Sequence, residues 1–302
     1  MAVFPQLRRQ RSKREEPIGE IPGGQRHRAI LLMPGMIWLV IFSILPLALV
    51  VVYSFASRGT YGGIEFKWTL ENYARLADRL YLAILWRSFL FAFATTVLCL
   101  VLGYPMAYAI ASSPEPRKNR LLLLIVVPFW TNFLIRTYAW IIILRGQGLI
   151  NGLLMHLGLI SEPLRMLYTP GAVLLGFVYN WLPFMILPLY ASLEKIDRSY
   201  IEAAMDLGAQ GRYVLTKVIL PLSLPGIAAG CVLVFIPALA MFAIPDLLGG
   251  ARTMLVGNLI KNQFLSARNW PFGSAASVFL IVAMLLALFI YRHVLQRAQG
   301  HG

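Results

Sequence analysis

The chain has 302 residues, of which 59% are hydrophobic and only 13% are charged, and it carries a formal net charge of +14. Since an ordinary soluble domain has about 25% charged residues, this composition excludes a typical soluble protein and indicates membrane spans. A positive charge can indicate nucleic-acid binding, but beside long apolar runs it is explained first by lipid headgroups and membrane topology. We therefore expect a lipid bilayer around the chain and no nucleic acid.

The amino-terminal segment, residues 1–28, is rich in Arg, Lys, Pro, Gly and Gln and has no apolar pattern that could bury a core. We interpret it as a disordered basic tail. It is too long and polar for a cleaved signal peptide, and no small-residue cleavage site follows the first apolar run. Its positive charge should hold the amino terminus in the cytoplasm.

Six apolar runs are long enough to cross a bilayer, which requires about 20 helical residues. With both termini inside, the inner loops and tails carry more Lys and Arg than the outer ones, in agreement with the positive-inside rule. Several runs contain prolines, and Pro46 should kink the first. We therefore predict an all-α membrane protein whose spans cover residues 29–57, 88–113, 121–144, 166–193, 218–245 and 274–291.

No residue pattern indicates an enzyme. The sequence has no H-E-x-x-H, G-x-S-x-G or G-x-x-x-x-G-K-[ST] motif, and its four histidines are scattered over tails and one loop. Cys99 and Cys231 lie within apolar runs and are interpreted as buried small side chains rather than as a disulfide or a metal site. Without a phosphate-binding loop the chain should not hydrolyse ATP, so we expect no catalytic residue, metal or cofactor in it.

Residues 199–222 form a polar-flanked segment of helical character between two long apolar runs. Ser199 followed by Glu202 is a capping box, which predicts a helix that begins at Ser199. Gly208 should end this helix, and an apolar set from Val214 should begin another that continues into the membrane. The sequence thus predicts two helices joined by a kink outside the bilayer and rigidly connected to a span.

The motif residues of this segment fall at the spacing of a known family. Glu202-Ala203-Ala204 is followed by Gly208, six residues after the Glu, and then by Leu220-Pro221. This pattern resembles the EAA loop of binding-protein-dependent ABC importer permeases, E-A-A, Gly and then I-x-L-P, with Val218 where the family usually has Ile. In that family the loop, here residues 195–222, is a cytoplasmic coupling helix in a cleft of the ATPase. Glu202 then has two compatible roles, in helix capping and in docking. The implied coupling residues are Glu202, Ala203, Ala204, Gly208, Leu220 and Pro221.

A longer similarity covers residues 29–295. Runs such as PFWTN at 128–132, LPFM at 182–185 and NWPF at 269–272 resemble the first permease subunit of spermidine/putrescine importers. The resemblance implies the type I (MetI-like) ABC importer permease fold, with six transmembrane helices in a domain over 29–295 and a cytoplasmic tail over 296–302. It also implies a bacterial inner membrane location with both termini in the cytoplasm.

The same resemblance implies an assembly. A second, homologous permease would complete the pathway, and two copies of an ATPase subunit would bind ATP and Mg²⁺. A periplasmic substrate-binding protein would deliver the polyamine to the outer loops. ATP would close the ATPase dimer, move the coupling loops and switch the paired permeases from inward to outward facing.

Two polar residues, Asn132 and Arg136, lie one turn apart near the middle of the third predicted span. Ionisable groups within spans are costly and tend to be functional. Arg136 either snorkels to the outer interface, pairs across helices or lines the translocation path. Asn132 on the same face agrees with each interpretation, so both residues are candidates for the substrate path.

Asp246 is the candidate contact for a cationic substrate, because the spans contain no other carboxylate and Asp246 closes the fifth. Ammonium groups need carboxylates, and aromatic faces attract cations; Phe242 lies one helical turn before Asp246. In the polyamine permeases that the chain resembles, the matching Phe and Asp and the Lys at Lys261 line the path near the outer gate. The family's aromatic beside that Phe is Ala243 here. The alternative is an Asp that only ends the helix.

Other function classes remain open. Related ABC permeases carry ferric ions, thiamine or other small solutes of amino-acid-like size. A secondary transporter would explain proline-kinked spans but typically has ionisable pairs within helices and an internal repeat. A channel or scaffold subunit would leave the coupling loop unexplained. Transport after ATP depletion distinguishes these classes, because an ABC importer stops while a gradient-driven carrier persists until its gradient decays.

Overall fold

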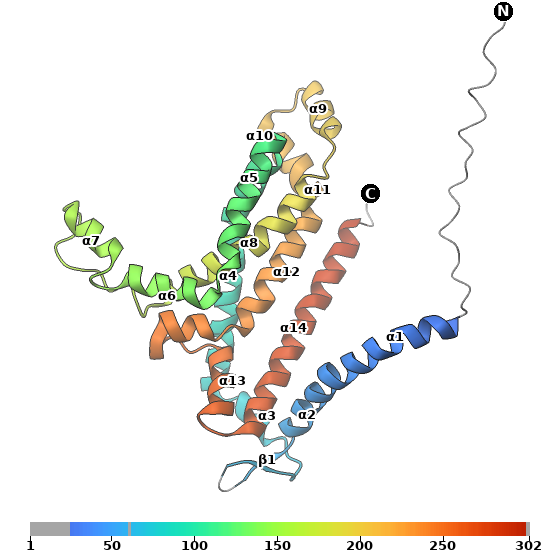
Figure 1. Cartoon of the computed structure of the whole chain (residues 1–302), viewed down its shortest axis with the longest axis vertical. Coiled ribbons are helices and arrows are strands. Elements are labelled where there is room, and N and C mark those ends of the chain that lie inside the picture. Colours follow the sequence, from blue (N-terminus) through green and yellow to red (C-terminus); the bar gives the residue numbers. More distant parts are fainter. Residues whose placement is uncertain (1–24, 60–61, 300–302) are drawn as a thin grey trace, which may run out of the picture. The chain divides into compact units, whose positions relative to one another are not determined.

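The structure is a computed structural model, which describes residues 25–59 and 62–299. Almost all of the described chain is helical, as the sequence predicts (Figure 1). The chain divides into two units, residues 1–49 and residues 50–302. The basic tail predicted over residues 1–28 lies outside the described residues except for its last part, which belongs to the first helix.

The first unit contains α1 (Gln25–Leu39), the π-helical turn η1 (Val40–Ile44) and the beginning of α2 (Leu45–Ser54). The π turn lies directly before Pro46, where the sequence predicts a kink. Proline has no N–H, and its ring collides with the carbonyl four residues earlier, so the backbone before it rearranges. The Leu45 N–H accordingly donates to the carbonyl of Val40. Leu32–Ser54 is the first candidate membrane span.

The second unit contains the other helices and a two-stranded antiparallel hairpin. In Figure 1, α9 and α10 lie at one end of this unit, and α3 and β1 lie at the opposite end. The elements of this unit after α2 are β1 (Ser57–Arg58), β2 (Ile64–Glu65), α3 (Glu71–Leu76), α4 (Arg79–Ala111), α5 (Glu115–Val126), η2 (Val127–Trp130), α6 (Phe133–Leu144), α7 (Leu149–His156), α8 (Pro170–Leu193), α9 (Arg198–Asp206), α10 (Gly211–Val214), η3 (Leu215–Ile219), α11 (Leu220–Leu222), α12 (Leu224–Ala240), η4 (Pro245–Gly249), η5 (Gly250–Arg252), α13 (Val256–Leu265) and α14 (Trp270–Gln299).

The core of this unit lies where α4, α8 and α12 pack together. Met185 on α8 is fully buried, and glycines on both neighbouring helices make room for it. A Cβ atom at Gly103 would lie 3.1 Å from the Met185 side chain, and one at Gly230 would lie 2.6 Å from its sulfur. Small residues allow this close approach, which matters in lipid because apolar burial contributes little between helices there. A bulkier residue at Gly230 would therefore separate α8 from α12.

The third predicted span is broken, so the prediction of one continuous helix over residues 121–144 is wrong. α5 ends at Val126, a 3-10 turn follows, and α6 begins only at Phe133. Pro128 removes a backbone donor from this stretch, and the chain is extended at Thr131. Only Thr131 and Asn132 interrupt the apolar run at the break, so the average hydropathy of residues 121–144 did not reveal it. By length and composition, the candidate span here is Phe133–His156.

The fifth predicted span, residues 218–245, is also not a single helix. The segments Gly211–Leu222 and Leu224–Ala240 meet at an angle of 65°. Ser223 lies at the bend and shares a hydrogen bond of 3.0 Å with the Tyr104 hydroxyl on α4, and Pro225 follows it. α12 then ends at Ala240, where the backbone of Met241 is extended. The prolines that the sequence shows in this run thus mark a bend and not only gentle kinks.

With the bent pair counted as one span, the described residues contain up to six candidate spans, in agreement with the prediction. Several starts differ from the predicted ones: α4 begins at Arg79 and not at residue 88, and α14 begins at Trp270 and not at residue 274. α8 begins at Pro170 rather than at residue 166, with the Thr169 hydroxyl accepting from the Ala172 N–H. At α4, the polar Arg79 lies in the first turn, which a hydropathy pattern does not register.

Candidate functional site

The segment that resembles a coupling loop forms α9, α10, η3 and α11 at one end of the second unit (Figure 1). α9 is capped by Asp197, whose Oδ1 accepts from the Ser199 N–H at 2.9 Å. The predicted capping box is therefore wrong, because Ser199 lies inside the helix. Acceptance of the Ser199 N–H lowers the pKa of the Asp197 carboxyl below its ordinary value. Glu202 is exposed, so its carboxylate is open to other partners.

Gly208 turns the chain at the end of α9. Its φ of +83° is in the left-handed region, which glycine adopts without the steric cost of a Cβ atom. The Gly208 N–H donates to Met205 O at 2.8 Å, and the Ala209 N–H donates to Ala204 O at 3.0 Å. These bonds close the last turn of the helix. A Cβ atom here would meet nothing within 4 Å, so this side of the turn is open.

Apolar side chains project from this segment instead of packing into the core. Leu207 is 90% exposed, and Tyr200, Met205 and Tyr213 are also exposed. A hollow of about 570 Å³ between α9 and α10 is lined by Ala204, Leu207 and Gly208, together with three further residues of the segment. Exposed apolar side chains gathered on one helix are typical of a protein-binding surface.

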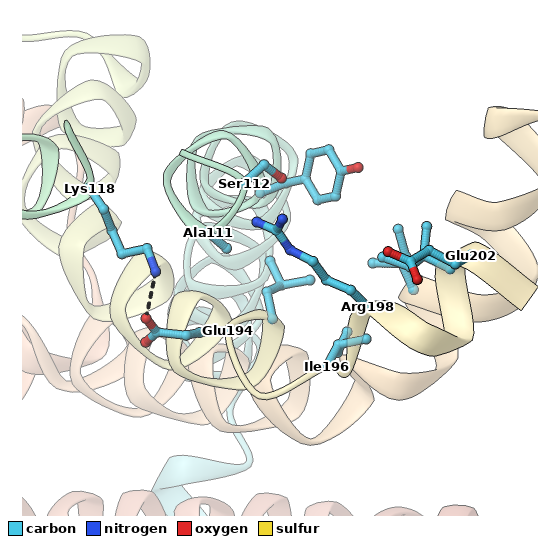
Figure 2. Close-up of a pocket in the computed structure, with 11 residues that line it drawn as sticks. Ala111, Ser112, Lys118, Glu194, Ile196, Arg198 and Glu202 are labelled. Carbon is cyan, nitrogen blue, oxygen red and sulfur yellow. Dashed lines mark hydrogen bonds and ion pairs between the residues drawn. The ribbon is translucent and has the colours of Figure 1, made fainter. Parts of the chain in front are cut away.

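A second hollow lies behind α9, between the ends of α4, α5 and α8 (Figure 2). Lys118 on α5 is nearly buried there, and its Nζ lies 2.9 Å from Glu194 Oε1 and 3.1 Å from Glu115 Oε1. The bonds with Glu194 and Glu115 raise the pKa of Lys118. The Tyr190 hydroxyl and Lys118 lower the pKa of Glu194. The ion pair thus ties α5 to the connection between α8 and α9.

Replacement of Lys118 by methionine should lower the thermal stability of the protein, because Glu194 would lose its cation. Because the pKa of Lys118 is raised, Lys118 stays protonated at every pH below that pKa. Because the pKa of Glu194 is lowered, Glu194 stays ionised until the pH falls to that pKa, so the ion pair is intact between the two pKa values. The difference in melting temperature between the two proteins should therefore be clear at pH 7. It should shrink as the pH falls through the pKa of Glu194.

The matched control is Lys67→Met. Lys67 also pairs with a glutamate, at 3.0 Å, but its side chain is 79% exposed and should contribute little. Melting temperatures of the detergent-purified proteins over pH 3 to pH 8 provide the measurement. Equal melting temperatures for Lys118→Met and the unmodified protein at pH 7 would contradict a structural role for the ion pair.

Three of the predicted substrate-path residues, Phe242, Asp246 and Lys261, converge near η4 and α13. Lys261 Nζ lies 2.6 Å from Asp246 Oδ2 and 5.8 Å from the centre of the Phe242 ring. Asn258 was missed by sequence reasoning: its Nδ2 donates to Asp246 Oδ1 and, at 2.9 Å, to Phe242 O. Asn258 is one helical turn before Lys261 on the same face, which is the signal that could have identified it. Phe242, Asp246, Asn258 and Lys261 are called the Asp246 cluster below.

Two contacts fix α13, one to α4 and one to the end of α12. The Ser88 Oγ on α4 accepts from the Val256 N–H at 2.7 Å, which satisfies a donor in the first turn of α13. A Cβ atom at Gly257 would lie 2.5 Å from Ala240 O and 2.9 Å from Met241 O, so only glycine allows this approach. The resulting position places Asn258 and Lys261 next to Asp246.

Asn132 and Arg136 make their contacts elsewhere. Asn132 caps α6, with its Oδ1 accepting from the Leu134 N–H at 2.8 Å. The guanidinium carbon of Arg136 lies 4.8 Å from the centre of the Phe129 ring and 5.9 Å from that of Tyr179. Its buried Nε has no hydrogen-bond partner within the described part of the chain. Cation–π contact with two rings thus holds Arg136 between α6, η2 and α8.

Together, the apolar spans, the bent helices and the exposed segment at one end define an integral membrane protein of the type I ABC importer permease class. The family described as binding-protein-dependent transport system inner membrane component matches residues 99–300. The chain belongs to this family. It is therefore a multi-pass inner membrane permease subunit of an ABC importer.

Relatives support the same class. The spermidine/putrescine transport system permease protein PotB of Salmonella typhimurium strain LT2 is 48% identical over 254 residues, which cover 84% of this chain and 88% of that protein. PotB of Escherichia coli strain K12 is 47% identical over 254 residues, 84% of this chain and 92% of the relative. The inner membrane ABC transporter permease protein YdcU of E. coli K12 is 34% identical over 236 residues, 74% of each chain.

Solved structures share the fold. A chain of a bacterial alginate ABC transporter, in complex with an alginate pentasaccharide-bound periplasmic protein, has a TM-score of 0.71 at 18% identity. The match covers 90% of this chain and 94% of the other. A chain of the MetNI methionine ABC transporter in an inward facing conformation has a TM-score of 0.55 at 16% identity, over 73% of this chain and 97% of the other. The predicted MetI-like fold is thus confirmed.

Proposed function

We propose that this chain forms one half of the transmembrane pathway of an ATP-driven importer for polyamines such as spermidine and putrescine. The observation that carries the proposal is the identity of 47–48% with PotB proteins over 84% of the chain. The Asp246 cluster supports it, because a carboxylate next to an aromatic ring suits an ammonium group on a methylene stem. Asp246 directly follows the fifth predicted span, residues 218–245, which contains no carboxylate.

The importer would be completed by other chains. A second permease would form the other half of the pathway, and a dimeric ATPase would bind ATP and Mg²⁺. A periplasmic substrate-binding protein would present the polyamine. The exposed apolar face of α9, with Glu202, Ala203, Ala204 and Gly208 along it, supports docking into the ATPase. Leu220 and Pro221 would connect the docked segment to α12. This chain itself would not hydrolyse ATP.

Within the pathway, Phe242, Asp246 and Lys261 would line the outer part. Lys261 now neutralises Asp246. An arriving ammonium group would share or replace that contact, so the carboxylate would not be left as an unpaired charge in a region of low dielectric. Arg136 and Asn132 would line a separate stretch of the same path, where the guanidinium group of Arg136 lies over the rings of Phe129 and Tyr179.

The proposal is tested by uptake into vesicles that contain the assembled importer. Spermidine, putrescine, ferric ion, thiamine and an amino acid are supplied in turn with the matching binding protein. ATP-dependent uptake of polyamines alone is expected. Uptake of another solute in their place would reassign the substrate, and uptake that continues without ATP until an ion gradient decays would indicate a secondary transporter.

We also predict the membrane orientation. Both termini and α9 should be cytoplasmic, because ATP and the ATPase are available only there. Single cysteines at Ser113, Ser161 and Ser199, introduced after replacement of Cys99 and Cys231, should show inside labelling for the first and third and outside labelling for the second. Outside labelling at Ser199 would overturn the topology, because the coupling segment would then face away from ATP.

A further inference from the structure

The largest hollow near the Asp246 cluster is rimmed by arginines. It has a volume of about 1020 Å³ and lies between the end of α6, the segment before α8 and the η4–η5 turn. Arg145, Arg165 and Arg252 line it, and Asp246 forms part of its wall. All three arginines are exposed. They are called the arginine rim below.

Buried hydrogen bonds fix the spacing of this rim. Asn151 on α7 is fully buried, and its Nδ2 donates to Arg145 O at 3.1 Å and to Leu164 O at 3.0 Å. Its Oδ1 accepts from the Leu164 N–H at 2.9 Å. One amide therefore joins the backbone beside Arg145 to the backbone beside Arg165. The Tyr168 N–H donates to Leu248 O at 3.0 Å and so fastens the same segment to η4.

The charges of the rim are not balanced within the described residues. The ion pairs found there involve Lys67, Lys118 and Lys261, and none includes a rim arginine. Asp246 does not neutralise the rim, because its two carboxylate oxygens are bonded to Asn258 and Lys261. Guanidinium groups bind carboxylates through paired, planar hydrogen bonds. Three of them at one hollow thus form a surface suited to acidic side chains.

We propose that Arg145, Arg165 and Arg252 form ion pairs with carboxylates of the substrate-binding protein and so hold the opening of its binding site over Asp246. This inference rests on the proposed function. A protein that carries polycations must place carboxylates around its own binding site. The rim would pair with such groups as the binding protein docks, while Asp246 takes the released ammonium group.

The arrangement also explains how cations could approach a positively charged entrance. Before the binding protein docks, the positive charge of the arginine rim repels free polycations and so lowers their local concentration at the entrance. Docking of an acidic protein cancels that field. Delivery would therefore depend on the binding protein, and free polyamine would be a poor substrate for the importer.

The test measures ATPase stimulation of the assembled importer in nanodiscs of zwitterionic lipid, as a function of the concentration of polyamine-loaded binding protein. The triple variant Arg145→Gln, Arg165→Gln, Arg252→Gln should need about tenfold more binding protein for half-maximal stimulation. Basal ATPase activity and the maximal stimulated rate should stay unchanged. Added salt should weaken stimulation of the unmodified importer more than that of the variant.

Arg117→Gln is the matched control, since Arg117 is an exposed arginine on α5, in the coupling half of the protein. It should leave the half-maximal concentration unchanged. If the triple variant does not assemble, Arg252→Gln alone, on a short exposed turn, should raise the half-maximal concentration and so carries the same test. An unchanged half-maximal concentration in both variants would overturn the proposal.

A further arm repeats the measurement with phosphatidylglycerol in the nanodiscs. If the rim binds lipid headgroups instead, the variants and the unmodified importer should have the same half-maximal concentration in zwitterionic lipid and differ only when phosphatidylglycerol is present. This result would also overturn the proposal. Failure of the proposed function gives a different pattern. A binding protein loaded with another solute would then stimulate the importer, and the rim variants would still weaken its docking.

Discussion

Replacement of Asp246 by asparagine should reduce the uptake efficiency (kcat/KM) for spermidine and putrescine by about 10- to 100-fold, while the protein still inserts and assembles. Asparagine keeps the size of the side chain and can keep the hydrogen bond with Asn258, but it cannot pair with an ammonium group. Loss of one charge-assisted contact corresponds to about 1.5–3 kcal/mol. The measurement is ATP-dependent uptake of radiolabelled polyamine into vesicles.

Two controls separate the charge of Asp246 from general damage. Glu65→Gln removes a carboxylate that also pairs with a lysine, at 3.0 Å on the exposed hairpin, and should leave uptake unchanged. Lys261→Met leaves Asp246 charged but free of its partner, so the apparent affinity for polyamine should change while transport persists. Unchanged kinetics of Asp246→Asn for every polyamine would remove Asp246 from the pathway.

Replacement of Gly208 by tryptophan should abolish coupled uptake and the co-purification of the ATPase. The turn has a φ of +83°, so a side chain there costs about 1 kcal/mol of local strain. Since no atom in the described part of the chain lies within 4 Å of the added Cβ, the indole has room in the isolated permease and insertion should be normal. The large effect should come from the indole entering the space that the docked ATPase needs.

Gly208→Asn is the matched control for Gly208→Trp. Asparagine tolerates the left-handed conformation better than other residues with a Cβ atom and adds little bulk, so most coupling should remain. Pull-down of the ATPase and ATP-dependent uptake are measured on both variants. Normal uptake by Gly208→Trp would show that this turn does not contact the ATPase.

The sequence predicted the type of fold and the short exposed helix that ends before Gly208, because both rest on strong local patterns. Apolar runs identify helices that cross a bilayer, and a glycine after a short helix identifies its end. The capping residue was misassigned because Asp197 and Ser199 are both good caps two positions apart. Only the observed bond from the Ser199 N–H distinguishes them.

The breaks within helices could not be predicted in the same way. Around Ser223 the composition stays apolar, and near Pro128 only Thr131 and Asn132 interrupt the apolar run, so the average hydropathy of these broken spans resembles that of straight ones. Asn258 escaped notice for a related reason: it lies between the fifth and sixth predicted spans, where the hydropathy pattern indicates no span, yet it is 3% exposed. Its role depends on the packing of Gly257 against Ala240 and Met241, a contact between segments that no local pattern encodes.

The bend at Ser223 changes how a push on α9 can reach the outer half of the protein. A straight rod would work as a piston and displace both of its ends equally. With an angle of 65° between its two arms, the same element would instead turn about the bend when α9 is pushed, as a crank does. The Ser223 hydroxyl shares a hydrogen bond with the Tyr104 hydroxyl on α4, so this pivot is attached to the neighbouring helix. The second arm, α12, leads to the segment that carries Phe242 and Asp246, where a small displacement of α9 would arrive as a sideways movement.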